Sequence, residues 1–245
     1  MSLFTSCEGV FDGLYDDAKT APPIDGTLYV EAKEWDKWYY IDLQTLHEHI
    51  KNDPLYDVNK DWQSFNIPMA DTDTPKEYVS GHHKTGQYMY WFDGTIGQAV
   101  KGHEFRYFTQ TEEQEAPEEW TFAVHRSEVR TNGGAVLETS LTNIMDVNIK
   151  DWKDSSFQPD VWSETDVWDD PSQMLLQLIP CQGIYINKVL SSWLSLGLMP
   201  NYIMNNHVFL LRLSDGSYAA LQLVNHLSPS GVRCCLTIKF RYPIE

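Results

Sequence analysis

Short catalytic motifs are absent from this sequence. It contains no GxSxG nucleophile elbow, no phosphate-binding Walker loop and no dinucleotide-binding GxGxxG fingerprint. Its four cysteines form no CxxC pair, so neither a zinc site nor a redox motif is indicated; they are Cys7, Cys181, Cys234 and Cys235. The sequence therefore predicts a protein that is not an enzyme, and it leaves open whether Cys181, Cys234 and Cys235 pair.

Positive charge is also scarce. The chain has 18 Lys and Arg against 35 Asp and Glu, which gives a formal net charge of −17. Such a surface repels nucleic-acid phosphates and anionic lipid headgroups, so an anionic ligand would need a local basic patch. No apolar run approaches the roughly 18 to 20 residues that span a bilayer as a helix. We expect no nucleic-acid partner and no membrane-spanning helix.

Aromatic residues are abundant, at 13% of the 245 residues. Aromatic and β-branched side chains favour strands, so the expected fold class is all-β, a single antiparallel β-sheet-rich domain with little helix. Strands are predicted at residues 27–32, 38–43, 88–92, 104–108, 120–126, 207–213, 218–224 and 232–242. Tight turns are predicted at Asn132-Gly133-Gly134, at Asp215-Gly216 and at 228–231.

Three other segments give weaker patterns. Residues 44–86 are expected to form a loop-rich insertion with one helical turn around Leu46 to Ile50. An apolar stripe at Ile186, Val189, Leu190, Trp193 and Leu194 predicts a helix that Gly197 and Pro200 would end. No regular element is predicted between residues 148 and 173, where Trp152, Trp162 and Trp168 are scattered among acidic residues.

Residues 8–26 have a composition that cannot build a core, with several Asp, Pro and Gly. Phe4-Thr5-Ser6-Cys7 resembles the end of a bacterial lipoprotein signal peptide, in which the cysteine becomes the acylated first residue. We therefore interpret residues 1–26 as a signal-peptide remnant and flexible lipoprotein tether, with Cys7 as the lipid anchor. We expect residues 27–245 to form the β domain.

Two patterns that could carry chemistry are weak. Acidic pairs of the glycosidase kind can be drawn from Asp160, Glu164, Asp166, Asp169 and Asp170, but sequence spacing does not fix their separation. His47-Glu48-His49 and His82-His83 lack a third metal ligand within reach. Solvated surfaces are the simpler interpretation of both.

Three blocks taken in order resemble the HmuY-like haem-binding lipoprotein family. They are the segment 37–42 (KWYYID), the segment 120–134 (WTFAVHRSEVRTNGG), and the C-terminal run from Trp193 through His207-Val208-Phe209 to the Asp215-Gly216 hairpin and residues 218–223 (YAALQL). Residues 11–16 (FDGLYD), following Cys7, match the usual tethered start. Together these blocks cover most of the chain outside residues 44–86.

This resemblance implies a surface lipoprotein that captures haem between two loops for iron acquisition, with one side chain from each loop binding the iron. The first loop, 170–174 (DPSQM), is similar to the Asp-Met-Ser-x-Met motif of methionine-type members, although Pro171 and Leu175 depart from it. The second, 193–200 (WLSLGLMP), is similar to their Trp…Met-Pro stretch. The implied iron ligands are Met174 and Met199, since no histidine aligns with either position.

Thioethers are soft, neutral ligands that suit haem iron. The nearest substitutes are Met204 and His207, although His207, like His125, falls within a predicted strand, where core or edge residues are the usual interpretation. The cations nearest the motifs that could meet haem propionates are Lys188, Arg126 and Arg130. The resemblance further implies attachment to a bacterial outer membrane surface through the lipid anchor, or secretion, and exchange of haem with an outer-membrane receptor or a host haem protein.

Two alternatives stay open. Trp152, Trp162 and Trp168 in a polar stretch are what a carbohydrate-binding surface lipoprotein would show. A family member that has lost haem binding and acts in protein interaction is the other, because Pro171 and Leu175 alter the first loop motif.

Overall fold

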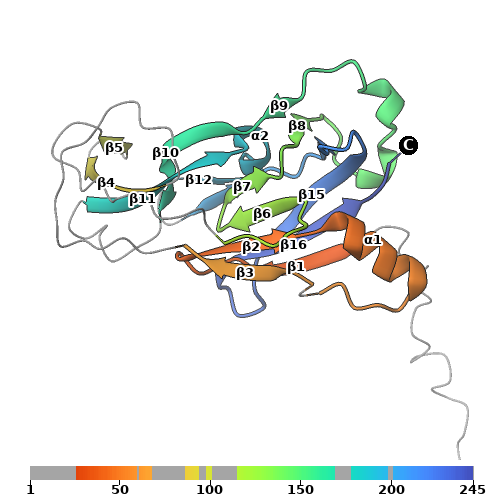
Figure 1. The fold of residues 1–245 in the computed structure, drawn as a ribbon, viewed down its shortest axis with the longest axis horizontal. Helices are drawn as coiled ribbons and strands as arrows, with labels where there is room; N and C mark the ends of the chain where they lie inside the picture. The colour runs from red at the N-terminus through yellow and green to blue at the C-terminus, as the bar shows by residue number, and fades with distance from the viewer. Residues whose placement is uncertain are drawn as a thin grey trace, which may run out of the picture.

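The structure is a computed structural model. Antiparallel strands make up most of its regular secondary structure, and only a few short helices accompany them (Figure 1). It describes residues 26–59, 61–67, 86–93, 98–100, 115–168, 178–197 and 201–244. The predicted all-β fold class is confirmed. The predicted strand at 104–108 lies outside the described residues.

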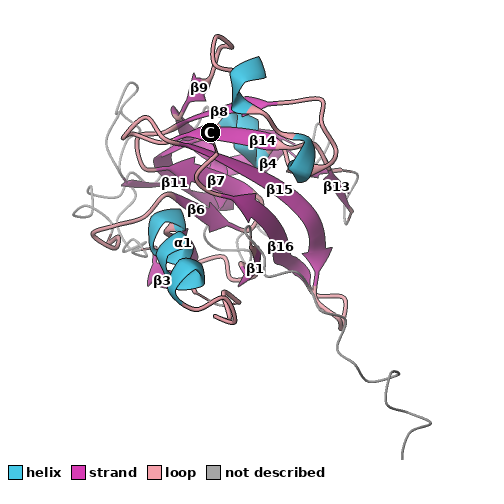
Figure 2. Cartoon of the chain, turned by 90° about the vertical axis from the view of Figure 1, so that its right-hand side faces the viewer, coloured by secondary structure: helices cyan, strands magenta, loops and turns pink. Residues whose placement is uncertain are grey.

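A six-stranded antiparallel sheet contains the C-terminal strands, and Figure 2 shows two of them, β15 and β16, as long curved ribbons. Its order is β1 (Thr27–Glu31), β16 (Arg233–Arg241), β15 (Tyr218–Leu227), β14 (Phe209–Arg212), β8 (Ala135–Glu138) and β9 (Gln158–Pro159). The predicted Asp215-Gly216 hairpin joins β14 to β15, with φ of 86° at Gly216. Gly133 and Gly231, in the other two predicted turns, also have positive φ.

A four-stranded sheet forms the middle layer, in the order β3 (Gln63–Asn66), β2 (Lys37–Ile41), β6 (Phe122–His125) and β7 (Glu128–Thr131). Side chains alternate across a strand. Tyr39 and Ile41 face the six-stranded sheet, while Trp38 and Tyr40 pack on the opposite face against Ile184. Because β2 is buried on both faces, its sequence is almost continuously apolar.

The third layer is the sheet β10 (Val161–Trp168), β11 (Leu178–Ile186), β4 (Gly86–Asp93) and β5 (Gln98–Val100). A separate hairpin pairs β12 (Leu194–Leu196) with β13 (Tyr202–Met204). The prediction of no regular element at 148–173 was wrong, since this segment holds β9 and β10. A register shift between Ser163 and Val167 interrupts the alternation that would have indicated a strand.

Two helix predictions need correction. The single turn expected near Leu46 is a ten-residue helix, α1 (Leu43–Asn52), which Asp42 caps by accepting hydrogen bonds from the backbone N–H of Gln44 and Thr45. The stripe from Ile186 to Leu194 is not one helix, because Ile186 ends β11 and Leu194 begins β12. Only α2 (Lys188–Ser191) between them is helical.

Two 3₁₀ turns, η1 (Ile144–Asp146) and η2 (Ile149–Asp151), cover the outer face of the six-stranded sheet. Among the helices of the described residues, none is long and apolar enough to cross a membrane. Cys234 and Cys235 in β16 are both buried free thiols.

Candidate functional site

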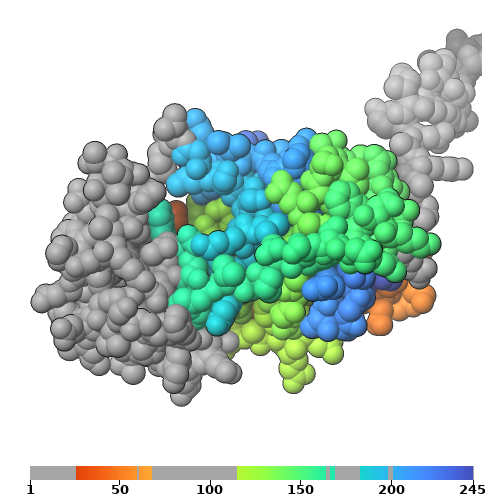
Figure 3. All heavy atoms as spheres, turned by 90° about the horizontal axis from the view of Figure 1, so that it is seen from above, coloured from red at the N-terminus to blue at the C-terminus, as the bar shows by residue number. Residues whose placement is uncertain are grey.

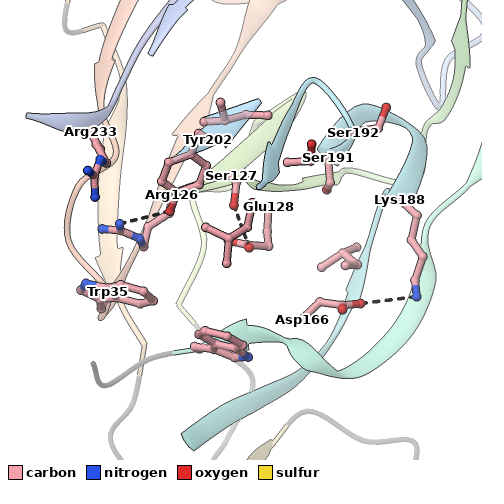
Figure 4. A pocket seen from close by; sticks show the side chains of 15 residues that line it. Trp35, Arg126, Ser127, Glu128, Asp166, Lys188, Ser191, Ser192, Tyr202 and Arg233 are labelled. Carbon is pink, nitrogen blue, oxygen red and sulfur yellow. Dashed lines mark hydrogen bonds and ion pairs between the residues drawn. The ribbon is translucent and has the colours of Figure 1, made fainter. Parts of the chain in front are cut away.

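A pocket of about 540 Å³ opens where the middle sheet, the β10–β11 strands and the β12–β13 hairpin meet. Figure 3 shows it as a hollow beside the blue and cyan C-terminal segments. Its lining combines aromatic and apolar side chains, serine hydroxyls and charged groups (Figure 4): Trp35, Arg126, Ser127, Glu128, Asp166, Trp168, Ile186, Lys188, Ser191, Ser192, Leu194, Ser195, Leu196, Tyr202 and Arg233.

Arg126 forms one wall of this pocket from the turn between β6 and β7. The pairing of His125 with Glu128 leaves Arg126 and Ser127 as a two-residue hairpin turn. Such turns require a positive φ at the first position, which is normally met by glycine, and Arg126 has φ of 54°. Its guanidinium lies 3.8 Å from the Trp35 ring centroid and donates to the Lys33 carbonyl oxygen at 2.6 Å.

Glu128 is the carboxylate beside that turn. It accepts from the Ser127 hydroxyl at 2.9 Å, and its second oxygen lies 3.2 Å from Nδ1 of His125. The fully buried His125 ring also meets the Trp35 carbonyl oxygen through Nε2. His125 thus ties the Trp35 loop to the β6–β7 turn, and its ring nitrogens are engaged within the fold.

Lys188 and Asp166 stand on the opposite side of the pocket (Figure 4). Lys188 Nζ lies 3.4 Å from Oδ2 of Asp166, and the same oxygen accepts from the Ser163 hydroxyl at 2.6 Å. The charge of Lys188 is therefore already balanced by a carboxylate.

Tyr202 and Arg233 complete the wall next to Arg126. The Tyr202 hydroxyl accepts from Nη2 of Arg126 at 3.3 Å, and burial is the main cause that raises the Tyr202 pKa to about 12. His226, whose ring contacts Tyr202, has a pKa lowered by burial and by the charge of Arg233. This wall carries positive charge in a protein that is strongly negative as a whole.

The predicted iron ligands Met174 and Met199 and the predicted anchor Cys7 lie outside the described residues. The described chain before Met174 and on both sides of Met199 reaches the pocket, however. Trp168 precedes Met174 by six residues, while Leu196 and Tyr202 each stand three residues from Met199.

Three cations were predicted as possible partners of the haem propionates. Of these, Arg126 and Lys188 line the pocket and Arg130 does not. Arg130 is enclosed by the rings of Trp38, Tyr40 and Trp120 at 5.0 to 5.2 Å, and its Nη2 donates to the Tyr40 hydroxyl at 2.6 Å. Burial lowers its pKa. Arg130 therefore packs within the middle sheet and does not face the pocket.

The substitute iron ligands Met204 and His207 are not among the residues that line the pocket. His207 binds Oε1 of Glu138 at 2.8 Å through Nδ1. Met204 in β13 pairs across the hairpin with Leu194 and is 37% exposed. No group of three or more His, Cys, Asp or Glu in the described part of the chain is arranged to hold a metal ion.

The three tryptophans of the carbohydrate alternative lie in three different environments. Trp152 packs beneath the six-stranded sheet, Trp162 stacks edge-on with Tyr185 at 5.3 Å, and Trp168 lines the pocket. They do not form one stacking platform.

Sequence reasoning missed Trp35, Glu128, Tyr202 and Arg233. They come from a loop, a hairpin strand, β13 and β16, so no local spacing connects them. The one usable pattern was the Arg126-Ser127 pair at the point where the apolar strand β6 reverses direction into β7.

Layered antiparallel sheets with an aromatic, partly cationic pocket are typical of β-sheet proteins that bind a ligand. The model of the HmuY protein family matches residues 34–242. The chain belongs to the HmuY family, whose members are non-enzymatic binding proteins. Among curated proteins, no sequence matches it.

Solved structures agree with this assignment. A protein from Bacteroides vulgatus assigned as a HmuY-like haem-binding protein is 27% identical, with a TM-score of 0.57 over 90% of this chain and 93% of that one. A protein from Bacteroides fragilis assigned as a lipoprotein is 25% identical, with a TM-score of 0.61 over 90% of each chain. The apo HmuY analog of Tannerella forsythia, at 16% identity and a TM-score of 0.59 over 88% and 94%, shares the fold.

Proposed function

We propose that this protein is a surface lipoprotein that captures haem in the described pocket for iron acquisition, with Met174 and Met199 as the axial ligands. The observation that carries the proposal is that the pocket lies where both methionine-bearing segments leave the described chain. Met199 is separated by three residues from Leu196 and by three from Tyr202, and three residues of extended chain span at most about 11 Å.

The pocket's volume falls within the range of about 300 to 1,000 Å³ typical of cofactor sites. Trp35, Trp168 and Leu194 offer apolar surface to a porphyrin ring. Arg126 and Arg233 bring positive charge to the lining, as a wall that meets an anionic group would require. The lining therefore fits a ligand that is flat, apolar and acidic at its edge.

Haem supplies an iron with two axial positions. Met174 and Met199 would each offer a neutral thioether, while the apolar lining excludes water from the ring faces. Haem would reach the pocket from a host haem protein and leave it to an outer-membrane receptor. The similarity to the HmuY-like protein of Bacteroides vulgatus supports this assignment.

The ligand type is tested by measuring haem affinity between about pH 7.5 and 5.5. Imidazole binds iron only when neutral and has an ordinary pKa near 6.5, whereas a thioether gains no proton in this range. We expect affinity to change less than about threefold. The lowered pKa of His226 limits its own protonation beside the pocket.

His207→Ala is the matched control, since that ring is engaged by Glu138. Its haem spectrum should equal that of the unaltered protein. A steep loss of haem affinity near pH 6 that disappears in His207→Ala would show that His207, and not one of the two methionines, binds the iron.

We further propose that acylated Cys7 anchors the protein at the outer membrane surface and that residues 8–26 form the tether. The small residues before Cys7 and the similarity to the lipoprotein of Bacteroides fragilis support this. Two or more acyl chains hold a protein stably, at about 0.8 kcal/mol per buried CH₂. Cys7→Ala in the full precursor should move the protein from the membrane fraction to the soluble fraction, and unchanged partition would refute the anchor.

A further inference from the structure

Two residues with a strained backbone lie at one wall of the pocket: Arg126 lines it, and Cys234 follows the lining residue Arg233. Arg126, at φ 54°, and Cys234, at φ 61°, are the non-glycine residues with positive φ in the described chain. The Tyr202 hydroxyl interacts with both of them. Strained backbone persists where surrounding structure holds it, and it gathers at ligand-binding positions. The strain here fixes the direction in which the Arg126 side chain leaves the β6–β7 turn.

Arg126 is held rigidly by three contacts. Its guanidinium stacks over Trp35, Nη1 donates to the Lys33 carbonyl oxygen, and Nη2 donates to Tyr202. Its Nε is buried and makes no hydrogen bond to any described group. A guanidinium fixed in this way loses little conformational entropy when it binds an anion.

Arg233 adds a second guanidinium on the same side of the pocket, and Figure 4 shows the two side chains close together above Trp35. Within the described residues, no carboxylate lies within ion-pair distance of either arginine. The two pocket carboxylates have other partners, since Asp166 pairs with Lys188 and Glu128 bonds Ser127 and His125. Two adjacent cations without a carboxylate are a site for an anion.

We infer that Arg126 and Arg233 form a carboxylate-recognition subsite that makes the pocket select tetrapyrroles with free propionate groups, whether or not a metal occupies the ring. This inference rests on the proposed haem function, but it needs neither Met174 nor Met199. Lys188, neutralised by Asp166, is not part of the subsite.

The test uses metal-free protoporphyrin and its dimethyl ester, which differ only in their two carboxylates and cannot be held through iron. Binding to the full chain is measured by quenching of tryptophan fluorescence in the same dilute detergent. A charge-assisted hydrogen bond contributes enough for a tenfold to hundredfold change. The unaltered protein should bind the diacid about 10- to 100-fold more tightly than the ester.

Arg126→Gln and Arg233→Gln should each remove much of this preference by weakening the diacid alone, with ester affinity unchanged. Since Arg126→Gln also loses its stacking on Trp35, the unchanged ester affinity separates the charge effect from a disturbed pocket. Arg212→Gln, at an exposed arginine over Phe157, is the matched control and should keep the full preference.

Equal affinity of the unaltered protein for diacid and ester would overturn the subsite and leave haem capture standing. Binding of haem without binding of the metal-free diacid would also overturn it, because iron would then carry the affinity. Failure of the unaltered protein to bind any of the three compounds would refute the proposed function itself. A preference that survives in both arginine variants would assign the carboxylates to other residues.

Discussion

Met174→Ala and Met199→Ala are each expected to convert the haem spectrum from six- to five-coordinate iron. Each removes one thioether, and the described pocket lining offers no other soft donor in its place. We expect at least a tenfold weaker affinity for each single variant, about 1.4 kcal/mol, and loss of tight binding in the double variant. Absorption spectra of the ferric and ferrous forms measure the coordination, and titration measures the affinity.

Met204→Ala is the matched control for both changes. Met204 stands in β13, beyond the residues that line the pocket. Its spectrum should stay six-coordinate. A six-coordinate spectrum in both single variants would mean that the alignment of the two loops with the methionine-type motif is wrong.

Asp160→Ala is expected to lower the free energy of unfolding by about 3 kcal/mol or more. Asp160 accepts hydrogen bonds from the backbone N–H and the hydroxyl of Thr131, at 2.7 and 2.8 Å, and from Nδ2 of the buried Asn187 at 3.0 Å. Each buried donor left unpaired costs about 1 to 3 kcal/mol. The carboxylate joins β7 to Asn187, which caps α2, so its loss disturbs both elements.

Denaturant titration measures this change in free energy, and the midpoint temperature of thermal unfolding should fall by about 6 to 12 °C. Asp146→Ala removes an exposed carboxylate that binds only Asn143 Nδ2 among described side chains, and it should cost less than about 0.5 kcal/mol. Equal stability of the two variants would show that the Asp160 contacts do not hold these layers together.

The sequence predicted β14 and β15 because the Asp215-Gly216 turn signal joins two largely apolar segments. It missed β10, because a register shift breaks the alternation there. It also extended α2 into its neighbours, since a strand end, one helical turn and a strand start together imitated a helical stripe from Ile186 to Leu194.

The site was less predictable for a physical reason. Trp35 and Arg233 are almost 200 positions apart in the sequence and meet only after three sheets have packed. Arg126 occupies a turn position at which residue preferences favour glycine, so local propensity argues against its conformation. Long-range packing against Trp35 and Tyr202 decides its geometry.

Titration of the purified protein with haem, followed by absorption in the Soret region, tests haem capture most directly. We expect a shifted Soret band that saturates at one equivalent of haem, with the spectrum of six-coordinate iron. A Soret band that stays at the position of free haem throughout the titration would contradict haem capture.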